Sequence, residues 1–234
     1  MNTNIHEIAD GIYRINTSLP PAIAPPNGFS FNQYLIVDDE PVLFHTGSRR
    51  LFPSVVEAIG KVMPIERLRH IAFSHYEQDE CGSLNSFLSA APRSAPLGGA
   101  IGAMINGDGF DRPLRVLNDG QSLPIGKRKV RWLDAPHLPH GWECGYLFEE
   151  TTKTLFCGDL FTQPGTGDIP LTDKDILEPS LAMAKQLDYW AHARDSGALL
   201  EKLAALSPRT LACMHGSAWQ GDGAGLLRQL SRHV

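Results

Sequence analysis

Cysteine is scarce in this chain of 234 residues, and no two cysteines form a Cys-x-x-Cys pair. The N-terminal segment also lacks the basic stretch followed by an apolar one that marks a signal peptide. We therefore predict a cytoplasmic protein whose cysteines are reduced thiols and not disulfides. Cys157 and Cys213 lie within apolar runs, which favours a role as small core residues. Cys81 is predicted to be neither a metal ligand nor a redox-sensitive thiol.

Other features that would assign a function are also missing. No run of 18 or more apolar residues is present, so no transmembrane helix is predicted. The net charge of −5 gives no electrostatic reason to expect a nucleic acid as partner. The glycines form neither a Gly-x-Gly-x-x-Gly nucleotide loop nor a Gly-x-Ser-x-Gly nucleophile elbow. The remaining composition, 42% hydrophobic and 20% charged, is that of an ordinary globular protein.

Short β-like runs predict strands in both halves of the chain. The predicted strands span residues 11–15, 33–37, 41–45, 70–73, 130–133, 145–149, 154–157 and 210–214. Helical patterns occur at residues 53–63, 82–90, 178–193, 196–206 and 223–233, with a helical turn predicted at 100–105. Two β-rich halves, each finished by helices, indicate an α/β fold with two sheets packed face to face and helices outside. We predict one such domain over residues 1–234.

The most informative segment is His75-Tyr76-Glu77-Gln78-Asp79-Glu80-Cys81, directly after a predicted buried strand. If the extended backbone continues, His75, Glu77 and Asp79 point to one side, because side chains alternate along a strand. One imidazole and two carboxylates would then face the same point in space. The segment therefore predicts a metal site.

Three more candidate ligands follow predicted strands. His137 comes after residues 130–133, Asp159 after 154–157 and His215 after 210–214, each with a Gly or Pro nearby. Taken singly, a histidine after a strand is more often a hydrogen-bonding residue, and Asp159 could simply cap a turn. Four such clusters at strand ends, which are rigid supports, favour a shared metal site.

These motifs resemble the metallo-β-lactamase superfamily, and specifically its di-iron branch of flavodiiron proteins and oxygen-binding di-iron proteins. The branch pattern His-x-Glu-x-Asp is similar to His75-x-Glu77-x-Asp79. Three further segments resemble those that carry the remaining ligands: 137–142, 156–159 and 214–216. The resemblance implies an αββα sandwich of two mixed β-sheets. A chain of 234 residues leaves no room beside that fold for a flavodoxin-like domain, so we expect neither that domain nor a flavin within it.

The resemblance also implies how two metal ions are held. One ion would take His75, Glu77 and His137, the other Asp79 and His215, and Asp159 would bridge them. Glu77 stands where the zinc enzymes of the superfamily have an imidazole. A carboxylate there makes the donor set harder and more negative, which suits iron or manganese better than zinc. We therefore expect two iron ions, with zinc or manganese as alternatives.

The chain departs from the family pattern at two positions. Glu80 replaces the histidine that follows the motif's aspartate, and it could bind the second ion, hydrogen-bond a ligand or face solvent. His45 stands where the superfamily commonly has an aspartate, which indicates a supporting position behind the site. His140 is the competitor of His137, and it could line the cavity as a proton donor.

The function that these residues favour is binding of dioxygen at a non-haem di-iron site. Reduction of O2 or NO would need an external electron donor, and without one an oxygen sensor or carrier is expected. The alternative is a di-metal hydrolase of esters, thioesters or lactams that uses a metal-bridging hydroxide. The expected partners are O2 or a small-molecule substrate and a redox or signalling protein, with a homodimer as one assembly that the chain could form.

Overall fold

The computed structural model describes residues 2–24 and 26–234, and its first half forms a seven-stranded sheet. In spatial order its strands are β1 (Asn2–Ala9), β2 (Ile12–Leu19), β3 (Phe29–Ile36), β4 (Val42–Phe44), β5 (His70–Ala72), β6 (Ala95–Gly98) and β7 (Arg115–Val116). Strands β1 to β4 pair antiparallel, and the pairs from β4 to β7 are parallel. The sheet is therefore mixed, as predicted.

The second half forms another seven-stranded mixed sheet. In spatial order its strands are β12 (Leu171–Thr172), β14 (Ala218–Gln220), β13 (Thr210–Cys213), β11 (Thr154–Gly158), β10 (Gly145–Glu149), β9 (Lys129–Asp134) and β8 (Ser122–Pro124). The pairs β11–β13 and β12–β14 are parallel. Strands β10 and β11 are buried throughout, as expected of central strands that are covered on both faces.

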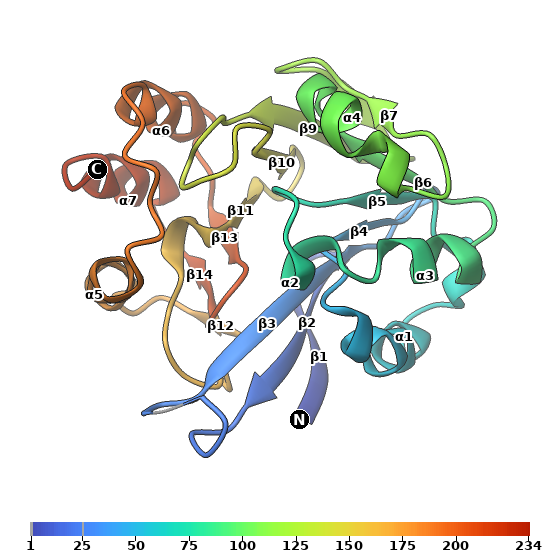
Figure 1. The fold of residues 1–234 in the computed structure, drawn as a ribbon, viewed down its shortest axis with the longest axis horizontal. Helices are drawn as coiled ribbons and strands as arrows, with labels where there is room; N and C mark the ends of the chain where they lie inside the picture. The colour runs from blue at the N-terminus through green and yellow to red at the C-terminus, as the bar shows by residue number, and fades with distance from the viewer. Residues whose placement is uncertain (1, 25) are drawn as a thin grey trace.

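Helices cover the outer face of each sheet (Figure 1). The α-helices are α1 (Phe52–Gly60), α2 (Gln78–Cys81), α3 (Leu84–Ala90), α4 (Ala100–Asn106), α5 (Leu177–Leu187), α6 (Ser196–Ala204) and α7 (Gly223–Leu230). Single 3-10 turns are η1 (Arg49–Leu51), η2 (Ile65–Arg67), η3 (Gly107–Gly109) and η4 (Asp159–Phe161). Helices α1 and α3 lie on the first sheet, and α5, α6 and α7 lie beside the second (Figure 1).

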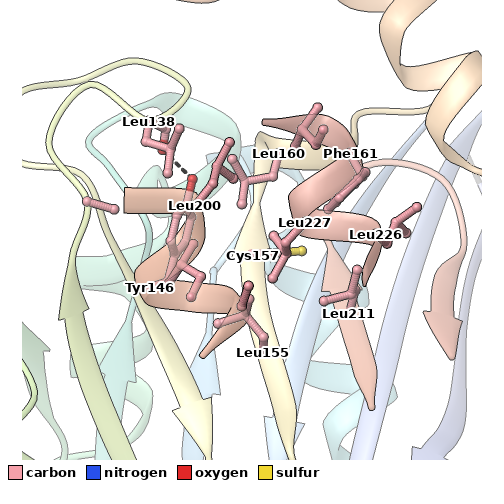
Figure 2. Close-up of a cluster of buried hydrophobic side chains, with 14 of the residues drawn as sticks. Leu138, Tyr146, Leu155, Cys157, Leu160, Phe161, Leu200, Leu211, Leu226 and Leu227 are labelled. Atoms are coloured by element: carbon pink, nitrogen blue, oxygen red, sulfur yellow. Dashed lines mark hydrogen bonds between the residues drawn. The ribbon is translucent and has the colours of Figure 1, made fainter. Parts of the chain in front are cut away.

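Three buried layers hold these parts together. Between the sheets, Phe156 of β11 packs against Tyr34 and Phe44 of the first sheet, with ring centroids 5.6 and 5.4 Å apart. Outside the second sheet, apolar residues of β10, β11 and β13 meet α6 and α7, as Figure 2 shows for Leu155, Leu200 and Leu227. A third cluster lies under α1 and α3. Burial of apolar surface in these layers fixes the sheets that carry the strand ends.

The αββα prediction is confirmed, and the differences lie at element ends and in short strands. The helix expected over 178–193 ends at Leu187, because Asp188 adopts a left-handed backbone with φ of 50°. The extended continuation expected after β5 is wrong, since the chain bends at residues 74–76 and Asp79 lies in the short helix α2. Among the described residues no helix is both long and apolar enough to cross a membrane.

Candidate metal centre

Four loops bring metal-capable side chains to one edge of the two sheets. His75 follows β5, Asp159 follows β11 and His215 follows β13, so each is held by a buried strand. His140 comes from the loop between β9 and β10, and helix α2 adds Asp79 and Glu80. Since these strands are parallel neighbours or belong to the facing sheet, their ends meet in one place. Residues far apart in sequence are thereby gathered into two groups of potential ligands.

The first group contains His75, Glu77, His140 and Asp159, whose donor atoms all lie within 4.8 Å of one another. Nε2 of His75 is 3.7 Å from both Glu77 Oε1 and Asp159 Oδ2. Nε2 of His140 is 3.3 Å from Glu77 Oε1 and 2.8 Å from Nε2 of His75. Two donors on one ion lie at most about 4.3 Å apart when each bond is about 2.0–2.2 Å. These four side chains therefore fit around a single ion.

The second group contains Asp79, Glu80 and His215, again with donor atoms within 4.8 Å of one another. Nε2 of His215 is 3.6 Å from Asp79 Oδ2 and 3.2 Å from Asp159 Oδ1. Because Asp159 presents Oδ2 to the first group and Oδ1 to the second, its carboxylate lies between them. This is the arrangement of a bridging carboxylate.

Each imidazole is turned so that Nε2 faces the cluster. Nδ1 of His215 is 2.8 Å from the carbonyl of Ser30, and Nδ1 of His140 is 3.0 Å from the carbonyl of Tyr189. A carbonyl only accepts, so Nδ1 carries a hydrogen and Nε2 is the nitrogen that can bind a metal. Nδ1 of His75 contacts the hydroxyl of Ser74 at 3.0 Å. Such partners behind the ring are typical of metal-binding histidines.

The electrostatics of the site fit a bound cation. Hydrogen bonds from His140 and His75 lower the pKa of Glu77 to about 2. Burial opposes ionisation of Asp159, but its hydrogen bond with His215 still lowers its pKa. Burial and the charge of Asp159 raise the pKa of Glu80. Several carboxylates thus lie close together, and their ionised forms depend on neighbouring positive charge, which metal ions would supply.

The structure does not bring His137 to the cluster. Its side chain is exposed and its backbone is left-handed with φ of 61°, while its N–H donates to the carbonyl of Gly141 at 2.8 Å. Leu138 fills the core beside Tyr146, whose hydroxyl donates to the Leu138 carbonyl (Figure 2). With Leu138 turned inward, His137 points to solvent, and the loop returns to the site at His140. In the structure His140, and not the expected His137, lies in the first group of potential ligands.

Glu80 and His45 are both fully buried beside the site. Neither oxygen of Glu80 has a hydrogen-bond partner in the described part of the chain. Nε2 of His45 lies 3.0 Å from the hydroxyl of Ser74, and burial lowers the pKa of His45 to about 3, so its ring is neutral. His45 thus supports the site through Ser74, the kind of place that the sequence indicated.

Sequence reasoning missed two supporting residues, Ser74 and Tyr189. The hydroxyl of Tyr189 donates to the carbonyl of Asp159 at 3.0 Å, so this residue holds both Asp159 and His140. Tyr189 lies in the stretch 178–193 that was predicted as helix, so a position beside the site was not expected for it. The adjacency of Ser74 to His75 was a usable signal, but the direction of its hydroxyl cannot be read from sequence.

Comparison with known proteins places this geometry in a family. A family model described as "ODP family beta lactamase" matches residues 29–216. A nitric oxide reductase from Moorella thermoacetica is 23% identical over an alignment of 242 positions, gaps included, that covers 96% of this chain and 60% of that protein. A rubredoxin-oxygen oxidoreductase from Megalodesulfovibrio gigas is 25% identical over an alignment of 143 positions that covers 59% of this chain and 35% of that protein. This chain therefore spans at most about three fifths of the length of either relative.

Solved structures agree on the fold. A fragment of a putative diflavin flavoprotein from Nostoc sp. superposes with a TM-score of 0.83 at 17% identity, covering 99% of this chain and 95% of that one. A flavoprotein from Thermotoga maritima gives a TM-score of 0.81 at 21% identity, with 100% and 61% covered. Because the family model matches well over half of its residues, the chain belongs to the ODP family of beta-lactamase-like proteins.

Proposed function

We propose that this chain is a non-haem di-iron protein that binds dioxygen and reduces it when an external electron donor is supplied. The observation that carries the proposal is the pair of ligand groups that share Asp159. One ion would be held by His75, Glu77 and His140, the other by Asp79 and His215, with Asp159 between them. The relatives named for nitric oxide and oxygen chemistry support the same class of reaction.

The donor set favours iron over zinc. Three imidazoles are combined with at least three carboxylates, Glu77, Asp79 and Asp159, and no thiol belongs to either group. Oxygen-rich sites suit iron and manganese, whereas thiolates and imidazoles dominate zinc sites. Two ferrous ions, when bound, supply the electrons that dioxygen accepts.

The protein's own residues then orient the ligands and limit access. The carbonyls of Ser30 and Tyr189 fix His215 and His140 in the tautomer that leaves Nε2 free. The side chain of Glu77 is 49% exposed, whereas that of His75 is 2% exposed, so a small molecule would reach the cluster from the Glu77 side. His140 was expected as a proton donor, but as a ligand it would hold a metal through Nε2 and would have no proton to give there.

We further propose that the protein works in the cytoplasm with a redox protein as donor. All four cysteines are free thiols, which agrees with a reducing compartment. The hydrolase alternative is not favoured, since the relatives described above carry oxidoreductase and flavoprotein names and Glu77 replaces the imidazole of zinc hydrolases.

The test is purification without added metal, followed by metal analysis, anaerobic reduction and admission of air. We expect about two irons per chain and a visible absorption band on aeration, accompanied by oxygen uptake. Two zincs per chain, no spectral response and turnover of an ester or thioester would contradict the proposal.

Glu77→His is the discriminating variant. It should shift the bound metal from iron toward zinc, because it removes the hard donor. Glu178→His, at an exposed position on α5, is the control and should keep the iron content of the wild type. Unchanged iron content in Glu77→His would refute the assigned role of this residue.

A further inference from the structure

Glu80 is a buried carboxylate that makes no side-chain hydrogen bond within the described residues. Its side chain is 0% exposed, and neither Oε1 nor Oε2 makes a hydrogen bond within the described residues. An ionised carboxylate is costly to bury unless a metal or a cation compensates its charge, and otherwise it takes up a proton. In the described chain its ion-pair contact is with Nε2 of His75 at 3.9 Å and no lysine or arginine pairs with it, so bound metal ions would be the charge that keeps Glu80 ionised.

The carboxylate of Glu80 reaches both ligand groups. Its Oε1 lies 3.9 Å from Nε2 of His75, which belongs to the first group. A carboxylate oxygen of Glu80 also lies within 4.8 Å of the donor atoms of Asp79 and His215, the second group. The first distance is below the limit of about 4.3 Å for donors that share one ion. Glu80 is therefore within reach of both positions.

The backbone holds Glu80 in this place. Its carbonyl accepts the N–H of Thr46 at 2.6 Å, which ties α2 to the segment after β4. The N–H of Cys81 donates to the carbonyl of Glu77 at 2.9 Å. Fixed backbone on both sides gives the side chain the support that a metal ligand needs.

We propose that Glu80 is a second bridging carboxylate, with one oxygen on each metal ion, at the position where the family pattern has a histidine. This inference rests on the proposed two-metal site. Of the roles that the sequence left open, a solvent-facing side chain is incompatible with complete burial. Neither oxygen makes a hydrogen bond to another residue of the described chain, which favours metal binding over a hydrogen-bonding role.

A second bridge changes the charge of the site. Glu77, Asp79, Glu80 and Asp159 contribute four negative charges, which balance two divalent ions, whereas a histidine at position 80 would leave three. The extra charge stabilises ferric over ferrous ions, because the more highly charged ion gains more from it. The chain should therefore have a lower midpoint potential than its own Glu80→His variant.

The first experiment is a redox titration of iron-loaded wild type, Glu80→Gln and Glu80→His. Neutralising Glu80 should reduce the preference for ferric iron at least tenfold, which raises the midpoint by about 59 mV per one-electron step. It should also weaken the magnetic exchange between the ferric ions, measured by susceptibility. Glu149→Gln is the matched control: this glutamate is equally buried in β10 but lies outside both ligand groups, so neither quantity should change.

The second experiment needs no variant. In a crystal structure of the metal-loaded wild type, Glu80 should have one oxygen about 2.0–2.2 Å from each ion. Glu80 bound to one ion or to none, or a Glu80→Gln protein with unchanged potential and exchange, overturns the bridge. If the bridge fails but wild type still binds two ions, the proposed function stands. If wild type binds fewer than two ions, both the bridge and the proposed function are overturned.

Discussion

At the scale of single residues, a hydrogen-bonded chain behind His75 decides which nitrogen of that ring faces the metal site. The N–H of Ser74 donates to Nε2 of His45 at 3.3 Å, so Nε2 of the neutral His45 is an acceptor. The hydroxyl of Ser74, 3.0 Å from both rings, can then donate to His45 and accept from Nδ1 of His75. Nε2 of His75 is left free for a metal.

Ser74→Ala should weaken metal binding about 10- to 100-fold, because loss of a hydrogen bond behind a ligand has that effect in other metal sites. Binding is measured by competition with a chelator, and the tautomer of His75 by nitrogen NMR of the metal-free protein. His45→Asn is the conservative comparison. Asparagine tolerates the left-handed backbone of residue 45, whose φ is 66°, and keeps an acceptor for Ser74. If His75 has the same tautomer in Ser74→Ala as in wild type, the hydrogen-bonded chain behind His75 does not set that tautomer.

His140→Ala and His137→Ala separate the two candidate histidines. The first should lose the ion of the Glu77 group, because a ligand 3.3 Å from Glu77 is removed. The second should keep about two metals per chain, because its side chain is exposed and outside both groups. Metal content per chain is the measurement. If His137→Ala lost a metal ion and His140→Ala kept both, His137 would be the ligand.

Residue types and spacing were enough to predict most of this cluster, since His75, Glu77, Asp79, Asp159 and His215 all lie in the two groups. The choice between His137 and His140 was not readable. It depends on which side chain of the loop enters the core, and the burial of Leu138 decides that only in three dimensions.

At the scale of elements, the turn from β11 into η4 sets the direction of Asp159. Gly158 has φ of 49° and ψ of −128°, a backbone conformation open almost only to glycine. A Cβ there would lie 3.0 Å from Ser74 and 3.2 Å from Tyr146. The strand end therefore depends on a residue without a side chain.

Gly158→Ala should destabilise the protein by about 1–3 kcal/mol, the usual range for strained backbone, measured by urea unfolding. It should also lower metal content, because Asp159 moves with the turn. Gly60→Ala is the control: a Cβ at this helical position meets nothing within 4 Å, and alanine should be neutral or stabilising. Equal stability of the two variants would contradict the strain argument.

Asp38 holds the turn between β3 and β4 through hydrogen bonds to its carboxylate. Asp38 accepts the N–H of Arg128 at 2.7 Å and that of Asp39 at 2.9 Å. Burial opposes ionisation of Asp38, but these hydrogen bonds favour the carboxylate and lower its pKa below the usual 3.8. A carboxyl with a lowered folded-state pKa stabilises the fold above its unfolded value, and that contribution is lost as pH falls through the folded value.

Asp38→Asn should therefore be less stable than wild type at pH 7 by about 1 kcal/mol, the net worth of a hydrogen bond. The difference should shrink when the pH is lowered below 3.8. Asp39→Asn, at an exposed neighbouring position, should follow the wild-type profile. Chemical denaturation at a series of pH values checks this, and a pH-independent difference would count against the turn.

Regular elements with strong patterns were predictable: Gly145–Glu149 forms the strand that was expected, with the same bounds. The two-residue strands β7 and β12 were not, because they exist through pairing with a neighbour and carry no periodic pattern of their own. The polar strand β1 was missed for the same reason, since its pairing with β2 stabilises it.

At the scale of the whole molecule, the metal site joins the two sheets. His75 belongs to the first sheet, and Asp159 and His215 extend from the second, so bound ions would link both halves. Anything that binds only the folded state stabilises it. Ions bound there would thus contribute to the stability of the fold.

Removal of metal by a chelator should lower the melting temperature. Metal at 100 times its dissociation constant contributes about 2.7 kcal/mol, which corresponds to roughly 5–11 °C for a domain of this size. The His140→Ala protein should respond less, because it holds one ion fewer. Identical melting with and without chelator would argue against ions that span the sheets.

Burial of the cysteine thiols limits their oxidation. Burial raises the pKa of Cys81 to about 12, and burial also raises that of Cys157, which lies two residues before Asp159. Oxidants attack thiolates that solvent can reach, and these sulfurs are neither ionised nor accessible. A protein that handled dioxygen beside them could do so repeatedly without damaging its own sulfur, so its durability would be built into the packing of the core.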